Sequence, residues 1–202
     1  MSRSDLVDEE PIELLPIDPS ALLHKTAFSE VEASSLFERL HDEIPWEQRQ
    51  VRMFGKWIDQ PRLVAWFGDP DAPYSYSGLT LDPHGWTPAV ESCRRRCEEL
   101  AGMSFNSGLA NLYRTGQDTV GWHSDDEPEL GDEPVIASVS FGATRRFDLR
   151  HRSGEPTVKV DLVSGSVVIM AGRCQSHWRH QIARTKRVDA PRINLTFRRL
   201  GR

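Results

Sequence analysis

Two stretches in the first half of the chain repeat apolar residues at helical spacing. In the first, Ser29 and Glu32 stand three residues apart in a capping-box pattern, and apolar residues follow at intervals of three or four until Pro45. In the second, Thr87 is followed by a proline and a similar apolar spacing, and Gly102 stands where such a helix would end. The pattern predicts two amphipathic helices.

The rest of the pattern is typical of strands. Residues 50–58 read as two short strand-like pieces about Gly55. Beyond Gly102, short apolar runs recur at roughly 8 to 12 residues, the spacing of an all-β sandwich or barrel. These runs cover residues 105–114, 119–124, 135–142, 145–151, 157–163, 166–172, 177–183 and 192–200. We therefore expect an α+β fold in which the helices pack on a jelly-roll-like barrel.

The size and composition allow one domain with a sizeable core, since the chain has 202 residues of which 38% are hydrophobic. The acidic, proline-containing residues 1–18 predict a flexible tail, which leaves 19–202 as the domain. The chain carries no signal-peptide pattern, no apolar run of membrane length and only three cysteines, so we expect a cytoplasmic protein with reduced thiols. The net charge of −5 means that nucleic-acid binding would need local basic clusters.

The last run alternates strictly between polar and apolar residues. Its polar face consists of Arg192, Asn194, Thr196 and Arg198. One interpretation is a half-exposed strand whose polar face meets water. The other is an inward face, where the two long arginine side chains converge on a dicarboxylate ligand.

A second candidate for chemistry is the pair His123 and Asp125, which point to the same side if they lie on a strand. A third ligand, His177 or His180, would complete the two-histidine, one-carboxylate triad that binds Fe(II). The same donors also fit a structural Zn(II) in a module without catalysis. The remaining histidines, interpreted as surface or packing residues, are His24, His41, His84 and His151.

The order of these parts resembles the AlkB family of iron- and 2-oxoglutarate-dependent dioxygenases, whose signature is HxD, a distant His and RxNxTxR. The resemblance runs from about Phe54 to Leu200 through "NLYRTGQDTVGWHSDDEPEL", "IASVSFGATRRFDLRHR", "SHWRHQI" and "APRINLTFRRL". The segments "YSYSGLTLDP" and "WHSDDEPEL" are most similar to the branch that repairs alkylated DNA bases. The family resemblance implies a double-stranded β-helix (jelly-roll) core over 105–202, and N-terminal helices with a nucleotide-recognition lid over 19–104.

The resemblance also implies roles for single residues. The iron ligands would be His123, Asp125 and His180, the last because it stands twelve residues before Arg192, where the family places its second histidine. Arg192 would pair with the distal carboxylate of 2-oxoglutarate. Asn111 and Tyr113 would hydrogen-bond the same co-substrate, and Asn194, Thr196 and Arg198 would lie toward its metal-bound end.

The implied activity is the demethylation of 1-methyladenine and 3-methylcytosine with Fe(II), 2-oxoglutarate and O2, which releases succinate, CO2 and formaldehyde. The partner would be alkylated DNA, duplex or single-stranded, or RNA, and we expect a monomer that does not bind membranes. The implied base contacts are Asp126, Glu127, Tyr74 and Tyr76, and the implied duplex-opening finger is Phe54, Gly55 and Lys56. RNA or protein hydroxylation and a non-catalytic metal module remain alternatives.

Overall fold

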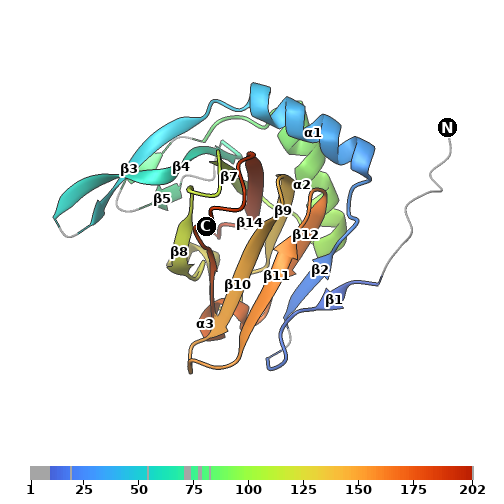
Figure 1. Ribbon diagram of the computed structural model, residues 1–202, viewed down its shortest axis with the longest axis vertical. Helices are drawn as coiled ribbons and strands as arrows, with labels where there is room; N and C mark the ends of the chain where they lie inside the picture. The colour runs from blue at the N-terminus through green and yellow to red at the C-terminus, as the bar shows by residue number, and fades with distance from the viewer. Residues whose placement is uncertain are drawn as a thin grey trace.

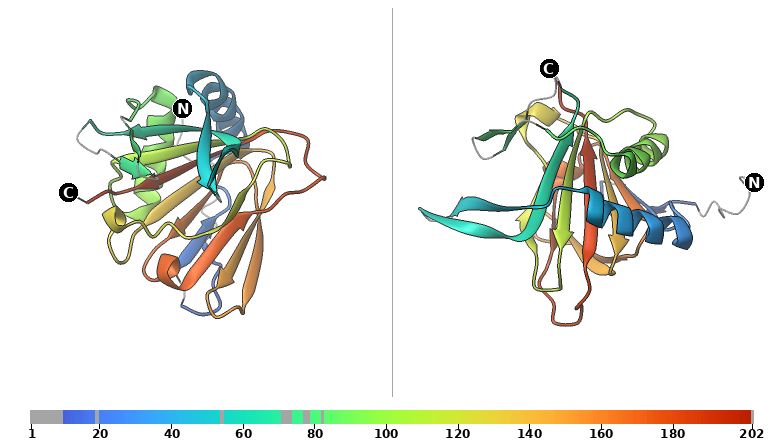
Figure 2. Two further views of the ribbon diagram at one scale, coloured as in Figure 1. Left: turned by 90° about the vertical axis from the view of Figure 1, so that its left-hand side faces the viewer. Right: turned by 90° about the horizontal axis from the view of Figure 1, so that it is seen from above.

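The computed structural model describes residues 10–18, 20–53, 55–70, 74–76, 79–81 and 83–201. Two antiparallel sheets form the framework of this part of the chain (Figures 1 and 2). The larger sheet comprises, in spatial order, β1 (Ile12–Glu13), β2 (Ala21–His24), β12 (Ser166–Met170), β9 (Ile136–Gly142), β14 (Arg192–Arg198), β7 (Ser107–Tyr113), β4 (Lys56–Gly68) and β3 (Glu47–Met53).

The smaller sheet has four strands in the order β11 (Thr157–Leu162), β10 (Arg145–His151), β13 (Trp178–Ile182) and β8 (Val120–His123). A separate hairpin consists of β5 (Tyr74–Tyr76) and β6 (Leu79–Leu81). All eight runs predicted after residue 102 are strands of the two sheets, which confirms the expected α+β fold with a jelly-roll core. The strand pieces around Gly55 are β3 and β4, and β4 continues further than the sequence pattern indicates.

Both predicted helices are present, as α1 (Glu30–Glu43) and α2 (Pro88–Ala101). Ser29 and Glu32 form the capping box of α1, and Thr87 caps α2, which ends at Gly102 in the left-handed conformation with φ 67°. Two short helical turns, η1 (Pro128–Leu130) and α3 (Cys174–His177), lie between strands. Within the described ranges, no helix is long and apolar enough to cross a membrane.

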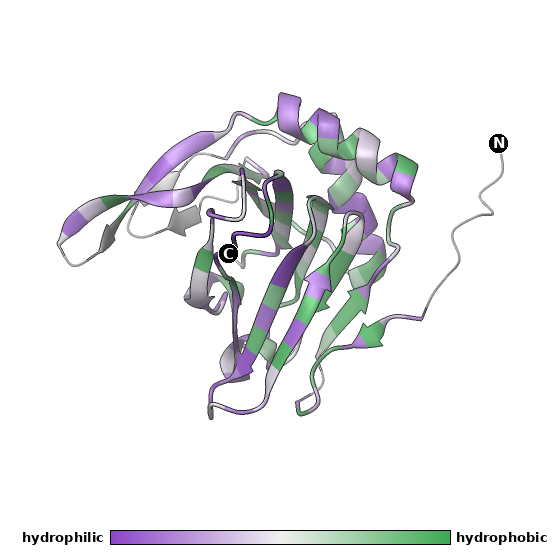
Figure 3. Cartoon of the chain, in the orientation of Figure 1, coloured by the Kyte–Doolittle hydropathy of each residue, from purple (hydrophilic) through white to green (hydrophobic). Residues whose placement is uncertain are grey.

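The hydrophobic core has two layers, one on each face of the larger sheet. Helices α1 and α2 cover the outer face (Figure 2), where Leu40 of α1, Cys97 of α2 and Phe141 of β9 are fully buried. The second layer fills the space between the two sheets and includes Leu149 and Trp178, also fully buried. Burying each such aliphatic side chain contributes roughly 1.5 to 3 kcal/mol. In Figure 3, hydrophilic and hydrophobic residues alternate along β11, which has one face in water.

The last strand, β14, lies in the middle of the larger sheet between β9 and β7, and all seven of its residues are buried. Its apolar residues, such as Leu195, belong to the layer under the helices. Its polar residues therefore point toward the smaller sheet rather than into water. The half-exposed interpretation of this strand is wrong, because a central strand covered on both faces has no solvent side.

Residues 10–18, which the sequence assigned to a flexible tail, include ordered contacts. Strand β1 pairs with β2, Leu15 is only 3% exposed, and the Leu15 amide donates to Glu13 Oε1 at 2.9 Å. The proline-punctuated, acidic pattern hides this strand because it is only two residues long. Residues 1–9 lie outside the described part of the chain.

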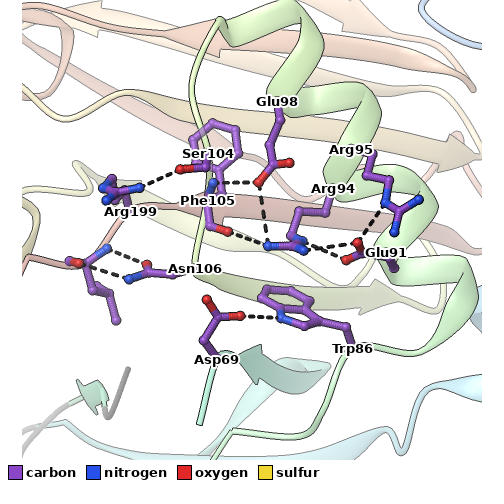
Figure 4. A network of polar contacts seen from close by, with 11 residues as sticks. Asp69, Trp86, Glu91, Arg94, Arg95, Glu98, Ser104, Phe105, Asn106 and Arg199 are labelled. Atoms are coloured by element: carbon purple, nitrogen blue, oxygen red, sulfur yellow. Dashed lines mark hydrogen bonds and ion pairs between the residues drawn. The ribbon is translucent and has the colours of Figure 1, made fainter. Parts of the chain in front are cut away.

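A polar network connects the residues that come before and after the segment containing β5 and β6 (Figure 4). Trp86, which follows this segment, donates its indole N–H to Asp69 Oδ1, which precedes it, at 2.8 Å. The guanidinium of Arg94 on α2 lies 4.7 Å from the Trp86 ring centroid, and it also donates to Glu91 and to the Phe105 carbonyl at 2.7 and 2.8 Å. The hairpin is therefore anchored at both ends to α2 and the sheet.

Replacing Ser29 by alanine is expected to lower the free energy of unfolding by about 1 kcal/mol, because the first turn of α1 loses its side-chain cap. Urea denaturation measures the change. The control is Ser35→Ala, which removes an exposed serine from the interior of the same helix and is expected to leave stability unchanged or slightly raised. Equal stability of both variants would show that the capping box does not support α1.

Candidate metal and anion site

The predicted site residues come together around a cavity of about 480 Å³ between the two sheets. Strands β8 and β13 of the smaller sheet form one wall, and β7 and β14 of the larger sheet form the opposite wall. The predicted residues that line the cavity are Asn111, Tyr113, His123, Asp125, Glu127, His180, Arg192, Asn194, Thr196 and Arg198. The jelly roll therefore gathers residues that lie far apart in the sequence.

Three of these residues form a cluster that could hold a metal ion. His123 is the last residue of β8 and faces His180 in the register of β8 with β13, and their ring centroids are 4.3 Å apart. Asp125 lies beyond the end of β8, not on the strand as the sequence pattern suggested. One ligand atom from each of the three side chains lies within 4.8 Å of the other two. By contrast, His177 ends α3 and does not line this cavity.

Neighbouring groups orient the cluster for metal binding. His123 Nδ1 lies 2.8 Å from the Gly121 carbonyl oxygen, which can only accept, so this nitrogen carries the proton and Nε2 keeps its lone pair. Asp125 Oδ2 forms an ion pair with Arg198 Nη2 at 2.9 Å, while Asp125 Oδ1 lies 3.8 Å from His123 Nε2. The Asp125 amide donates to Gln175 Oε1 at 2.9 Å. These contacts leave one imidazole lone pair and one carboxylate oxygen facing each other.

The charges of the cluster suit a cation. Burial raises the pKa of Asp125, but the positive charges of Arg198, His180 and His123 outweigh burial and lower the pKa to about 2. Burial, with His123 acting in the same direction, lowers the pKa of His180 to about 3. At neutral pH the carboxylate is therefore ionised and the imidazole of His180 is neutral, which are the forms that bind metals.

Across the cavity, Arg192 offers a buried anion site. Only 2% of this residue is exposed, and its Nη2 donates to Ser140 Oγ at 2.9 Å. Its Nε and Nη1 have no hydrogen-bond partner among the described residues. Burial lowers the pKa of Arg192 to about 10, although nearby Tyr113 offsets part of this effect. A buried guanidinium with two unused donor nitrogens favours a carboxylate partner, which the described residues do not supply.

The other polar residues predicted for the co-substrate form a connected layer on β7 and β14. Asn111 faces Asn194 in the strand register, and their side-chain amides lie 3.5 Å apart. Asn194 donates to Ser138 Oγ at 2.8 Å, and Thr196 donates to Asn194 Oδ1 at 3.1 Å. The guanidinium of Arg192 lies 5.2 Å from the ring centroid of Tyr113. These side chains are therefore held in place beside the anion site.

The predicted substrate contacts fall into three groups. Glu127 lines the cavity, whereas Asp126 is exposed and pairs with Arg152 at 2.9 Å, away from the cavity lining. Tyr74 and Tyr76 lie on β5, and their side chains are outside the described part of the structure, as is Phe54. The other two predicted finger residues are exposed: Gly55, with φ 79°, lies between β3 and β4, and Lys56 is the first residue of β4.

The sequence patterns did not identify three buried polar residues next to the site. Arg62 of β4 lines the cavity and donates to Asn111 Oδ1 at 2.6 Å. Arg145 is 2% exposed and donates to the Ala183 carbonyl at 2.9 Å, and Gln175 is 1% exposed. Arg62 directly precedes the apolar strand residues 63–67, and a charged residue at the start of such a run could have signalled burial beside a functional cavity.

The chain is similar to known proteins in sequence and in fold. Residues 20–198 match the 2OG-Fe(II) oxygenase superfamily. The bovine "Alpha-ketoglutarate-dependent dioxygenase alkB homolog 3" is 45% identical over 177 residues, which is 83% of this chain. The chain spans 61% of the length of that relative. The human "DNA oxidative demethylase ALKBH2" is 39% identical over 184 residues, which is 86% of this chain and 70% of the relative.

Among solved structures, OsALKBH1 is similar with a TM-score of 0.66 and 19% sequence identity, over 92% of this chain and 99% of that one. This likeness concerns the fold, in which the two-sheet core is shared. The relatives with higher sequence identity indicate which branch of enzymes this chain resembles.

Proposed function

Because this chain belongs to the AlkB family within the 2OG-Fe(II) oxygenase superfamily, we propose that it repairs DNA by oxidative demethylation of N-alkylated bases. Relatives named as DNA oxidative demethylases support the proposal. The observation that carries it is one cavity that holds a metal-binding cluster on one wall and the partly unpartnered Arg192 on the other. A metal that reacts with a bound keto acid needs both.

His123, Asp125 and His180 would hold Fe(II), since two imidazoles and a carboxylate leave the other positions open. When bound, iron with O2 and 2-oxoglutarate supplies the oxidation of the N-methyl group, and the products are succinate, CO2 and formaldehyde. The chain keeps the donors in the required protonation states. Arg198 holds the Asp125 carboxylate ionised, and the Gly121 carbonyl fixes the proton of His123 on Nδ1.

Arg192 would bind the distal carboxylate of 2-oxoglutarate through the two nitrogens that lack partners. Asn111 and Tyr113 would hydrogen-bond the same co-substrate, and Asn194, Thr196 and Arg198 would support its metal-bound end. The co-substrate would be enclosed between the two sheets, where the low exposure of these residues excludes water.

For the substrate, we favour 1-methyladenine and 3-methylcytosine, which are cations near neutral pH, unlike the undamaged bases. Glu127 lies in the cavity lining and would favour a positively charged base. Tyr74 and Tyr76, on the anchored β5–β6 hairpin, would stack on it. Asp126 would act indirectly, because it pairs with Arg152 at the surface. A base in a duplex must leave the stack to reach this cavity.

The hairpin of β3 and β4 is proposed as the element that opens a duplex. It projects from the body of the molecule (Figure 1), and near its tip Lys56 is exposed while Trp57 and Ile58 are 61% and 46% exposed. Exposed apolar side chains beside a cation suit insertion into a base stack with a contact to phosphate. Phe54, at the turn, would be the wedge.

Replacing Phe54 by alanine is expected to lower repair of a lesion in duplex DNA by about tenfold or more, because wedge insertion offsets part of an unstacking cost of a few kcal/mol. Repair of the same lesion in a single strand should change little, since nothing must be unstacked. Formaldehyde release on the two substrates measures the difference. Val31→Ala, which removes an exposed apolar side chain from α1, is the matched control. Equal losses on both substrates would assign Phe54 to packing.

The substrate class is tested by formaldehyde release from four probes with equal methyl content, namely 1-methyladenine in single-stranded DNA, in duplex DNA and in RNA, and a methylated lysine peptide. We expect release from DNA at rates at least tenfold above those for the peptide. Release from RNA alone or from the peptide alone would replace DNA repair by RNA or protein demethylation.

A further inference from the structure

A second group of potential metal ligands lies outside the cavity. Asp18, His151 and His177 each place one ligand atom within 4.8 Å of the others. Asp18 Oδ2 lies 2.9 Å from His177 Nδ1 and 3.6 Å from His151 Nε2. The side chains of the two histidines are 33% and 18% exposed, and that of the aspartate is 42% exposed, so a hydrated ion could reach all three. From the sequence, His151 was interpreted as a surface or packing residue, and the structure places it beside Asp18 and His177.

The backbone holds the two histidines together. His151 ends β10, and His177 ends α3 directly before β13. In the register of β10 with β13, His151 faces Trp178, and the Arg152 amide donates to the His177 carbonyl at 2.8 Å. Asp18 comes from the loop between β1 and β2, where its backbone has the left-handed φ of 49° that few residues other than glycine adopt. This conformation directs the carboxylate of a distant segment to the histidine pair.

Hydrogen bonding prepares His151 as a ligand. Its Nδ1 lies 2.6 Å from Ser153 Oγ, which donates its only proton to the Glu155 carbonyl at 2.9 Å. Ser153 Oγ therefore accepts from His151 Nδ1–H, a shorter contact than the 3.3 Å between this nitrogen and the Ser153 amide. His151 Nε2 is then a lone pair that faces the Asp18 carboxylate at 3.6 Å. A cation placed between these two atoms would be bound by both of them.

We propose that Asp18, His151 and His177 form a second metal site that binds Zn(II) as a structural ion, with solvent as the fourth ligand. Donor atoms 2.0 to 2.1 Å from a tetrahedral ion lie about 3.3 Å apart, and the distances of 2.9 and 3.6 Å to Asp18 Oδ2 lie on either side of this value. Without the ion, the hydrogen bond from His177 Nδ1 is the main cause that lowers the pKa of Asp18, so its carboxylate is ionised at neutral pH. Binding of the ion would displace this proton from Nδ1. The neighbouring Arg152 is turned to Asp126.

The ion would join the N-terminal segment to the smaller sheet, because its ligands come from the β1–β2 loop, from β10 and from the residue before β13. The site would therefore stabilise the fold without taking part in the reaction, as a clip between segments 133 and 159 residues apart in sequence. Binding of a metal to the folded state alone raises stability in proportion to the logarithm of the metal concentration above Kd.

The test is calorimetric titration of Zn(II) into the metal-stripped full-length chain and its variants. Wild type is expected to bind two equivalents, because the cavity cluster also accepts zinc. Asp125→Ala should retain one equivalent, and adding Asp18→Asn, which has nearly the same shape, should weaken this binding more than about 100-fold, since loss of an outer-shell partner alone costs about 10 to 100-fold. His177→Ala in the Asp125→Ala chain should have the same effect.

Thermal melting gives a second readout that does not depend on turnover. Zn(II) should raise the Tm of Asp125→Ala but not that of Asp125→Ala with Asp18→Asn. The matched control is His41→Ala, which removes a surface histidine 3.3 Å from the carboxylate of Asp42 and should leave the titration unchanged. The proposal fails if Asp125→Ala binds no zinc, or if the remaining equivalent survives both Asp18→Asn and His177→Ala.

Discussion

Alanine at His123, Asp125 or His180 is expected to abolish turnover, with a loss of at least about 10³-fold in formaldehyde release. A metal held by these three residues would supply several kcal/mol of the catalysis, and removing any one of them would leave two donors that cannot retain it in an open but fixed geometry. Asp125→Ala has a further effect, because it leaves the guanidinium of Arg198 buried without its carboxylate at 2.9 Å. Calorimetric titration of Mn(II) into each variant separates lost metal binding from lost chemistry.

His177→Ala is the matched control for these three variants. It removes a histidine only three residues from His180, but one that lies outside the cavity lining, so turnover should remain within about twofold of wild type. An active His180→Ala variant, or an inactive His177→Ala variant with a normal melt, would contradict the assignment of the metal ligands.

Replacing Arg192 by alanine is expected to weaken 2-oxoglutarate binding by about 10² to 10³-fold, because a buried charge pair that loses one partner costs about 3 to 5 kcal/mol. The two unused nitrogens of Arg192 are the donors that would be lost. Oligonucleotide binding should change little, since the residue lies at the bottom of the space between the sheets and is 2% exposed. Titration of 2-oxoglutarate into the Mn(II)-loaded chain measures the effect.

Two further variants test whether the loss of 2-oxoglutarate binding is specific to the guanidinium of Arg192. Arg192→Lys keeps the charge but not the planar pair of donors, so its binding of 2-oxoglutarate should lie between that of wild type and that of the alanine variant. Arg146→Ala removes an arginine from the exposed side of β10, where it pairs with Asp161 at 3.4 Å, and should leave binding unchanged. If Arg192→Ala binds 2-oxoglutarate as tightly as wild type, the anion site lies elsewhere.

The sequence predicts most of the secondary structure because local signals mark it. The capping residues Ser29 and Thr87 and the end of α2 at Gly102 are set by interactions within a few residues. Each run after residue 102 has the length and apolar content of a single strand, and the structure contains each one. The strand β1 is hidden because it is only two residues long, although it pairs with the next strand, β2. The full length of β4 depends on pairing with β7, which lies far away in the chain and which no local pattern reports.

The sequence predicts those residues of the candidate site that belong to a recognisable motif, but not how their neighbours are arranged. The pattern placed Asp125 on a strand, and the family resemblance implied that Asp126 faces the base, whereas β8 ends at His123 and Asp126 pairs with Arg152. The approach of Asp18 to His177 joins residues 159 positions apart, and only the closed sheet brings them together. The chemistry of a site follows from its residue types, but its boundary follows from tertiary packing.

The most direct test of this account is the stoichiometry of succinate and formaldehyde produced from a single-stranded oligonucleotide with one 1-methyladenine. Wild type with Fe(II), 2-oxoglutarate and O2 is predicted to form the two products in a ratio near one, with restoration of adenine. Neither product should form when iron or 2-oxoglutarate is omitted, or when the His123→Ala variant replaces wild type. Adenine restored without 2-oxoglutarate, or succinate formed at full rate with the base left methylated, would contradict it.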